Sequence, residues 1–348
     1  MLPRALSCVL SGGSDDNVPM ALAEITEPID LCWPDGRLRP QAVGWTRQPL
    51  HRSSLRRRGR TKRWEYWAVM SPEAFLGITV SDLDYAGLFA AYFLDESHRE
   101  TVRSALVPLA RLGLPDQSGG GPVSVKAKGL AIDLTPDGDR LSLEVRSPGL
   151  EASITVTRPA GHESLGVVVP WSGRRFQYTV KENTLPAFGE VHCDGVTTTF
   201  GDGAWATLDH GRGAWPYRIT WNWGSGSGVR DGHVIGVQLG GRWTDGTGST
   251  ENALCLDGRL HYIPHDLVWT YDRHDWQRPW RIRDPRGGRV DVTFLPEHVR
   301  EDRINLGILA NDTHQAFGTF EGTMRTDDLT PVDVTGIRGW VEEVRNRW

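Results

Sequence analysis

The stretch that decides the fold is "VSVKAKGLAIDLTPDGDRLSLEVRSPGLEASITVTRP", residues 123–159. Apolar and polar side chains alternate along it, as they do in strands that have one buried face. The alternating apolar positions are Val123, Val125, Ala127, Leu141, Leu143 and Val145. The segment "TPDGDR" between the two runs has Asp-Gly turn chemistry, so we predict a β-hairpin there.

The same pattern of short strands and turns extends over the rest of the chain. Its 40 glycines and 21 prolines divide it into short apolar and aromatic segments. In "LCLDGRLHYI", Asp257-Gly258 separates two alternating runs and predicts a second hairpin. The best candidate for a helix, Glu96–Gly113, is interrupted by Pro108. These features predict an all-β fold.

The length of 348 residues favours two lipocalin-like antiparallel β-barrel or sandwich domains in tandem over a single one. We expect a disordered leader over residues 1–24, a β-barrel-like domain over 25–189, and a second β-barrel-like domain over 190–348. The loop "KENTLPAFGE", with its proline and glycine, is the expected crossover between them. No repeat at the level of residues relates the two halves.

The charge balance argues against a nucleic-acid partner. The formal net charge is −5 and the pI is about 6.1, so no overall positive field attracts phosphates. One basic run, "HRSSLRRRGRTKR", is the exception, and it is interpreted either as a solvated loop or as a contact for phosphate or lipid headgroups.

Cysteine usage and hydropathy indicate a cytoplasmic protein. The four cysteines are scattered and form no C-x-x-C pair, which is typical of reduced thiols. The chain has no run of 18 apolar residues, so we expect no transmembrane segment. The N-terminal apolar run is shorter than that of a signal peptide.

Several long strings together make the chain resemble the bacterial family called domain of unknown function 2804, an uncharacterised family that brings no known activity. The resemblance covers the chain from about Ile25 to Trp348. The strings are "LCWPDGRLRPQAVGWTRQPLHR", "KRWEYWAVMSPEAFLGITVSDLDYAGL", "LPAFGEVHCDG", "LDHGRGAWPYRITWNWGSGSG" and "GWVEEVRNRW".

More distantly, the chain looks like a superfamily of paired lipocalin-like barrels. Carotenoid hydratases, tocopherol cyclases and β-barrel enzymes that promote intramolecular Diels–Alder closures belong to that group. The link rests on tryptophan content and on the expected architecture. It implies an enzyme without a cofactor that holds an apolar small molecule, although fold alone does not settle function.

Tryptophans mark the region in which we expect the binding site. Eight of the fifteen lie between residues 205 and 280. In a strand over "RITWNWGSG", Trp221 and Trp223 share one face and Asn222 lies on the other. Trp215, Trp221 and Trp223 would form an aromatic wall, and Asn222, Tyr217 and Arg212 would orient the substrate by hydrogen bonds. The alternative is that the tryptophans only fill the core.

Three acidic groups are candidates for a general acid. The first choice is Asp209, in "LDHGRGAW", where we expect the glycines to bend the chain sharply before a cavity-lining strand. The second is Asp82, with Asp84 on the same face of a regular strand and Tyr85 after it, since paired carboxylates split their pKa values. The alternative for this pair is a turn whose aspartates accept backbone N–H groups.

The third candidate is Glu190, with His192 two residues later on the same face. A Glu–His pair can act as a general acid–base couple, and the alternative is a polar pair beside a turn. A metal site would need a third ligand, which the sequence does not offer, so we expect none. "GSGSG", residues 224–228, lacks the features of a phosphate loop and is interpreted as a flexible hairpin end.

The main hypothesis is therefore a cofactor-free enzyme that cyclises, isomerises or hydrates an apolar polyene or isoprenoid-like molecule, assisted by one protonated carboxylic acid. The first alternative is a lipid or hydrophobic-metabolite carrier, which needs the cavity without the acid. The second is a carbohydrate-binding or carbohydrate-active protein, in which tryptophans would line an open groove. The oligomeric state is not predicted.

Overall fold

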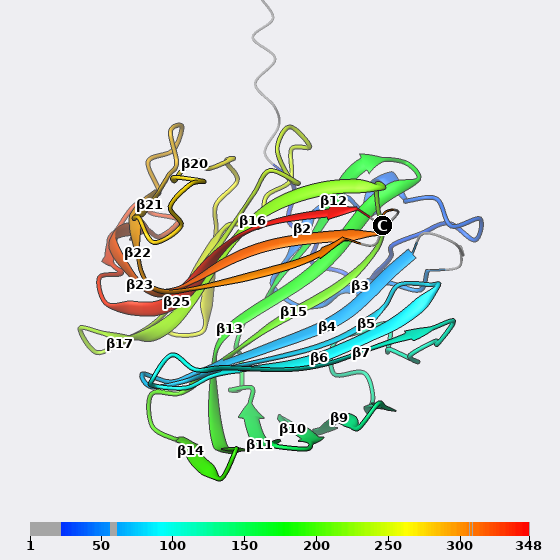
Figure 1. Ribbon diagram of the computed structural model, residues 1–348. Coiled ribbons are helices and arrows are strands. Elements are labelled where there is room, and N and C mark those ends of the chain that lie inside the picture. The colour runs from blue at the N-terminus through cyan, green and yellow to red at the C-terminus, as the bar shows by residue number, and fades with distance from the viewer. Residues whose placement is uncertain (1–21, 56–60, 306, 308, 348) are drawn as a thin grey trace, which may run out of the picture.

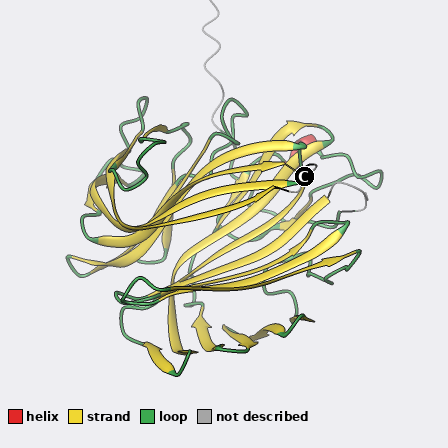
Figure 2. Ribbon diagram, viewed as in Figure 1, coloured by secondary structure: helices red, strands yellow, loops and turns green. Residues whose placement is uncertain are grey.

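The computed structural model describes residues 22–55, 61–305, 307 and 309–347. Nearly all regular structure is β-strand (Figure 2), which confirms the predicted all-β fold. Within these ranges the single helical element is the 3-10 turn η1 (Pro40–Ala42). Of the predicted leader, residues 1–21 lie outside the described part.

The first sheet has 13 strands and forms a nearly closed barrel. It curls until one edge strand, Glu100–Pro108, approaches Leu130–Asp137 near the other edge. From the same edge strand the Thr101 hydroxyl contacts Cys193 Sγ, and Arg103 Nε donates to the Pro148 carbonyl. Its strands are β2 (Trp45–Thr46), β4 (Thr61–Met70), β5 (Phe75–Asp82), β6 (Ala86–Leu94), β7 (Glu100–Pro108), β8 (Val123–Ala127), β9 (Leu130–Asp137), β10 (Arg140–Ser147), β11 (Leu150–Thr157), β12 (Leu165–Ser172), β13 (Arg175–Cys193), β14 (Val196–Phe200) and β15 (Trp205–Ala214).

The second sheet has ten strands and forms a half-barrel. A separate parallel pair, β1 (Ile29–Asp30) and β3 (His51–Arg52), lies outside both sheets. The strands of the second sheet are β16 (Arg218–Arg230), β17 (His233–Gly241), β18 (Ala253–Leu256), β19 (Arg259–Tyr262), β20 (Val268–Thr270), β21 (Trp280–Arg283), β22 (Val290–Asn305), β23 (Ala310–Arg325), β24 (Pro331–Asp333) and β25 (Ile337–Arg347).

Both predicted hairpins are confirmed. Strands β9 and β10 pair antiparallel around the "TPDGDR" turn, and β18 and β19 pair around Asp257-Gly258. The helix candidate was wrong, because its centre forms β7 and pairs residue by residue with β6. The segment "GSGSG" is also no hairpin end, since it lies within β16 and pairs with both β17 and β25.

The predicted boundary between residues 189 and 190 falls inside a single strand, β13. The chain passes from the first sheet to the second between Ala214 and Arg218 instead. The reason is that the expected crossover loop continues the strand: its residues pair with β11, β14 and β15. Strand β13 thus joins four neighbours of the first sheet.

The two sheets face each other across the middle of the molecule (Figure 1). Each has its own apolar core on the side that faces away from the partner sheet. Between them lies a third cluster of buried aromatic residues, in which Phe75 of β5 contacts Phe317 and Trp340, with ring centroids 4.6 and 5.6 Å apart. Strands β16 and β17 also contact β13 directly. Buried aromatic side chains from both sheets therefore meet in the contact region.

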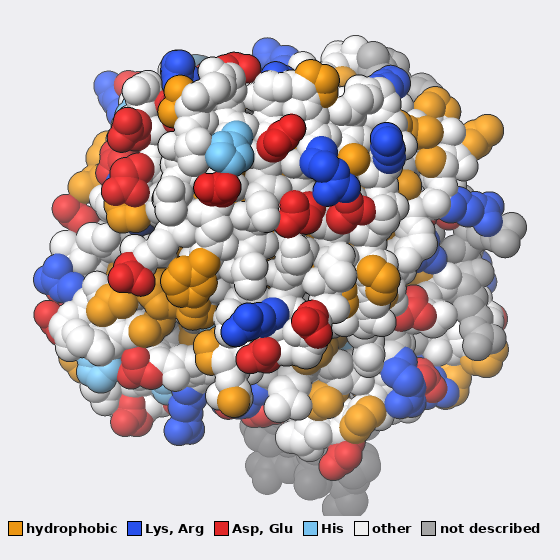
Figure 3. All heavy atoms as spheres, turned by 90° about the horizontal axis from the view of Figure 1, so that it is seen from below, with side chains coloured by type: hydrophobic (Ala, Val, Ile, Leu, Met, Phe, Trp, Pro, Cys, Tyr) orange, Lys and Arg blue, Asp and Glu red, His pale blue; other side chains and the backbone are white. Residues whose placement is uncertain are grey.

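On the face of the molecule shown in Figure 3, acidic and basic side chains are interspersed, with no large area of one sign. Among the described residues there is no helix with the length and apolar character that a membrane span requires.

Gly189 is the residue that lets β13 pair closely with its neighbour β11. Its φ of +146° is one that side chains rarely adopt, and a Cβ there would lie 2.0 Å from the Ser153 carbonyl oxygen. We expect Gly189→Ala to lower the free energy of unfolding by about 3 kcal/mol. Urea unfolding followed by tryptophan fluorescence measures this. The control Gly201→Ala, where a Cβ meets open space, should change stability by less than about 0.5 kcal/mol; equal effects would contradict the explanation.

Candidate functional site

A group of four buried ionisable residues lies between the two sheets, and we call it the inter-sheet acid cluster. Its members come from four separate segments of the chain. They are Lys181 of β13, Asp209 of β15, Glu251 just before β18, and Glu342 of β25. None of their side chains is more than slightly exposed.

Strand pairing places the first two members together. Lys181 and Asp209 are directly opposite each other in the β13–β15 ladder, so their side chains leave the same face. The Lys181 ammonium is 2.9 Å from Asp209 Oδ1, and the Thr179 hydroxyl donates to the same oxygen at 2.9 Å. Asp209 is therefore an ion-pair partner of Lys181, on the face that points towards the second sheet.

Glu251 approaches the same lysine from the second sheet. Its Oε1 is 3.9 Å from Lys181 Nζ and has no hydrogen-bond partner among the described residues. Burial raises the pKa of Glu251 to about 7, although the lysine opposes this change. Burial also opposes the charge of Lys181, but the carboxylates of Asp209 and Glu251 raise its pKa above the usual value.

Glu342 is held by two donors from its own sheet. Trp221 Nε1 donates to one carboxylate oxygen at 2.9 Å, and Gln315 Nε2 donates to the other at 3.1 Å. Register explains this, since Glu342 lies opposite Trp223 on one side and opposite Gln315 on the other. Burial raises its pKa to about 7, despite the Trp221 hydrogen bond.

The cluster holds one cation and three carboxyl groups. If all were ionised, two negative charges would remain without a partner in a buried site, which is strongly unfavourable. Protonation of carboxyl groups removes this excess negative charge. The raised pKa values of Glu251 and Glu342 show that these two groups take up protons most readily. The site can therefore keep carboxylic acids protonated near neutral pH, which is the property of a general acid.

Tryptophans contact the cluster: Trp221 donates to Glu342, and Trp223 packs against Lys181. Lys181 Nζ lies 4.4 Å from the centroid of the Trp223 ring, a cation–π contact. Trp215 packs against four other tryptophans at centroid distances of 5.0 to 6.1 Å: Trp64, Trp171, Trp221 and Trp243. We call these five residues the tryptophan cluster.

The predicted alternation along β16 is confirmed. Trp221 and Trp223 both point towards the first sheet, where they contact Trp215 and Tyr66. Asn222 points the other way and donates to the Tyr271 hydroxyl at 3.1 Å. Tyr217 lies between β15 and β16 and is 37% exposed, outside the acid cluster.

A groove of about 790 Å³ opens beside the tryptophan cluster, where β16 begins and β25 ends. Trp171 and Trp243 line it together with Ile219 of β16. From Ile219 the same face of β16 runs through Trp221 to Trp223, next to Glu342. By strand geometry, the four residues from Ile219 at the groove to Trp223 beside Glu342 span about 13 Å.

Arg212 was predicted at the same site as Asp209 but lies on the other face of β15. They are three positions apart in the sequence, an odd number, so strand alternation sends their side chains to opposite sides. The segment is also a regular strand and not the expected sharp bend. Gly211 in this segment makes room for the Trp64 ring, because a Cβ at this position would lie 2.1 Å from the ring.

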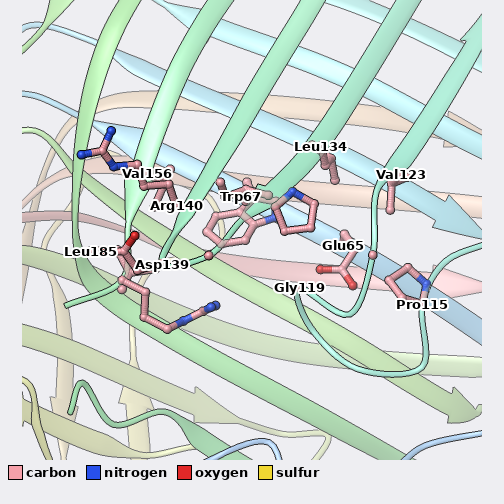
Figure 4. Close-up of a pocket in the computed structure, with 15 residues that line it drawn as sticks. Glu65, Trp67, Pro115, Gly119, Val123, Leu134, Asp139, Arg140, Val156 and Leu185 are labelled. Atoms are coloured by element: carbon pink, nitrogen blue, oxygen red, sulfur yellow. The ribbon is translucent and has the colours of Figure 1, made fainter. Parts of the chain in front are cut away.

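Arg212 belongs to a second buried group, inside the first barrel. Glu65 Oε1 accepts from His210 Nδ1 at 2.6 Å and from Arg212 Nη2 at 3.0 Å. Burial opposes the charge of Glu65, but its two partners hold its pKa below the usual value. Burial lowers the pKa of His210. Glu65 also lines a small cavity of about 50 Å³, with Trp67 and Leu185 among its walls (Figure 4).

The aspartates after β5 form the turn that was the alternative interpretation. Asp82 accepts from the backbone N–H groups of Asp84 and Leu112 at 2.8 and 3.2 Å. The expected shared face does not exist, because β5 ends at Asp82 and Asp84 has a φ of +76°. Tyr85 packs its ring against Lys62 Nζ at 4.2 Å.

Glu190 and His192 do lie on one face, 2.9 Å apart. Their side chains are 51% and 47% exposed, at the outer hairpin of β13 and β14. The structure therefore brings neither of them, nor Asp82, to the inter-sheet acid cluster. Among the described residues no group of three or more His, Cys, Asp or Glu side chains could hold a metal ion.

Sequence reasoning missed Lys181, Glu251 and Glu342. The string "GWVEEVRNRW" contained a usable signal: in an alternating strand, two adjacent glutamates must point to opposite faces, so one of them enters the interior. Lys181 gave a weaker signal, as a single cation after the apolar run "FQYTV". For Glu251 no local pattern exists.

A model of the family described as "Domain of unknown function (DUF2804)" matches residues 22–348. A comparison with curated proteins finds no match. Among solved structures, the crystal structure of CghA with Sch210972 is similar at 11% identity and a TM-score of 0.47, covering 82% of this chain and 88% of that one. Kievitone hydratase from Nectria haematococca is similar at 11% identity and a TM-score of 0.42, covering 83% and 89%.

Proposed function

The chain belongs to the DUF2804 family, and because this membership carries no activity, we propose a function from the site itself. The protein is a cytoplasmic, cofactor-free enzyme that binds an apolar, polyene- or isoprenoid-like molecule between its two sheets. It catalyses an acid-assisted cyclisation, isomerisation or hydration. The acid is Glu342. Asp209, the first choice from the sequence, instead forms an ion pair with Lys181.

The observation that carries the proposal is that three buried carboxyl groups lie around one buried lysine, which pairs with two of them, and that burial raises the pKa values of Glu251 and Glu342 to about 7. Glu342 is preferred as the acid because its carboxyl group is hydrogen-bonded to Trp221, which belongs to the tryptophan cluster beside the groove. Glu251 is the second acid of the site.

In the proposed step, the Glu342 carboxyl proton is transferred to one carbon of a substrate double bond. The π electron pair forms the new C–H bond, and a cation is left on the neighbouring carbon. Loss of another proton from this cation completes an isomerisation. Attack by a second double bond forms a ring and a new cation, which loses a proton to complete a cyclisation. Attack by water gives a protonated alcohol, which loses a proton to complete a hydration, and in each case the Glu342 carboxylate can take up the released proton. The rings of Trp221 and Trp223 stabilise the cation.

The burial of the tryptophans favours this function over carbohydrate binding. Trp215, Trp223 and Trp243 are 3%, 6% and 6% exposed, whereas a ring that stacks on a sugar must offer an open face. The carrier hypothesis needs the same apolar site, and the assay decides between carrier and enzyme.

Native mass spectrometry of the purified protein, before and after denaturation, tests the binding part of the proposal. We expect a co-purified apolar small molecule, or quenching of tryptophan fluorescence when polyenes and isoprenoids are added. Incubation with the bound compound should then yield a product of equal mass, or of one added water. Binding without conversion would identify a carrier. No binding to any compound of the panel would contradict the apolar site.

A further inference from the structure

The groove beside the tryptophan cluster carries an excess of positive charge. Its walls contain two aspartates, Asp245 and Asp312, against five arginines. The arginines are Arg218, Arg242, Arg303, Arg345 and Arg347. Among the residues that line the groove, arginines therefore outnumber aspartates by three, in a chain whose net charge is −5.

A single buried glutamate forms hydrogen bonds with two of the arginines that line the groove and with a third arginine nearby. Glu343, which is fully buried, accepts from Arg242 Nη1 at 2.7 Å, from Arg273 Nη2 at 2.7 Å and from Arg345 Nε at 2.8 Å. The three arginine side chains remain 37–45% exposed. One carboxylate therefore holds three guanidinium groups in place, and two of them, those of Arg242 and Arg345, border the groove.

Two further arginines face each other, and neither has an ion-pair partner among the described residues. Arg218 and Arg347 are directly opposite in the β16–β25 ladder, an arrangement in which like charges destabilise a sheet. Among the described residues the Arg218 side chain forms no ion pair or hydrogen bond, and the Arg347 side chain donates only to the neutral Asn305 side chain, at 3.2 Å. A bound anion would relieve this repulsion.

We propose that this groove binds the anionic head group, a carboxylate or a phosphate, of a small amphiphile. Guanidinium groups of Arg218, Arg345 and Arg347 recognise the head group, because they match its oxygens in charge and planar geometry. The apolar part lies against Trp171 and Trp243, which line the same groove. The groove lies where strands end, so residues from both faces of the sheet border it.

This site goes beyond the proposed reaction and does not depend on it, since the groove would bind an anion even if Glu342 transferred no proton. The shared chemistry of carboxylate and phosphate head groups defines the ligand, and matched probes separate the two. Suitable probes are dodecanoate, dodecyl phosphate, dodecanol and inorganic phosphate.

Titration by isothermal calorimetry at low salt tests the proposal on the full chain. Dodecanoate or dodecyl phosphate should bind at least about tenfold more tightly than dodecanol, and added salt should reduce the difference. Arg218→Gln should weaken binding of the better anion about tenfold and leave dodecanol unchanged. The control Arg281→Gln removes an equal charge from an exposed pair with Asp291 elsewhere in the sheet and should have no effect.

Equal binding of dodecanol and the two anions would overturn the proposal, as would equal losses in the two variants, which would indicate only a general charge effect. If inorganic phosphate binds as tightly as dodecyl phosphate, the dodecyl chain adds no affinity, and the proposal that the ligand is an amphiphile would be overturned. Glu342→Gln separates this site from the proposed reaction, because it should leave anion binding unchanged. Thermal melting of each variant checks that the fold is intact.

Discussion

Glu342→Gln is expected to lower kcat by about 10²–10⁴-fold, the usual contribution of a general acid. Glutamine keeps the shape of the side chain and an oxygen that can accept from Trp221, but it has no acidic proton. The substrate is the compound identified by mass spectrometry, and product formation is followed by chromatography.

The matched control is Glu190→Gln, which makes the same change at an exposed candidate from the sequence. It should leave kcat unchanged. A fully active Glu342→Gln variant would contradict the assignment of the acid, and a loss of activity in Glu251→Gln alone would transfer the role to Glu251.

The pH dependence of kcat follows from the raised pKa of Glu342. The acid acts in its protonated form, which dominates below its pKa of about 7. We therefore expect kcat to fall about tenfold for each pH unit above that value. A pH–rate profile between pH 5 and 9 measures this, and a rate that increases with pH would show that an ionised group acts as a base.

The same shift has a consequence for stability. Burial raises the pKa of Glu251 and of Glu342 from 4.5 to about 7, so the folded chain binds protons more tightly than the unfolded chain. Their contribution is fully present below pH 4.5 and is lost as the pH rises through about 7. Urea unfolding at several pH values should show this decrease, and it should be smaller in Glu342→Gln.

The second large effect is expected from Arg212→Leu, which should lower the free energy of unfolding by about 3–5 kcal/mol. Arg212 and Glu65 form a buried ion pair. The substitution would leave the Glu65 carboxylate with only His210, whose charged form burial disfavours. It would also leave the backbone carbonyls of Trp64 and Pro115 without this donor.

Urea unfolding of the variant and of Arg281→Leu gives the comparison. The control removes an arginine from an exposed ion pair, which typically contributes less than about 1 kcal/mol. Equal losses in the two variants would show that the buried pair has no special role.

Much of the fold could be predicted because it follows from local patterns. The hairpins over residues 123–159 and around Asp257-Gly258 combine alternation with Asp-Gly turns, and both signals act over a few residues. Strand β7 was mistaken for a helix because it has an exposed, charged face, which an edge strand tolerates. The domain boundary was missed because a proline and a glycine sit inside β13.

The candidate site could be predicted only where one strand carries it. The face shared by Trp221 and Trp223 follows from alternation, and so does the separation of Asp209 from Arg212. The inter-sheet acid cluster instead depends on the order of strands in two sheets. Lys181, Glu251 and Glu342 are far apart in the sequence, and only the observed pairing brings them together.

Strand β25 lies between β16 and β23 and supplies both Glu342 and Glu343. During synthesis, β16 leaves the ribosome long before its partner, and the middle of the second sheet must wait for residues from Ile337 onward. An unfinished chain therefore has exposed strand edges, which makes it a target for chaperones, and it lacks Glu342 and Glu343. The same strand thus closes the middle of the second sheet and adds the last carboxyl group of the inter-sheet acid cluster.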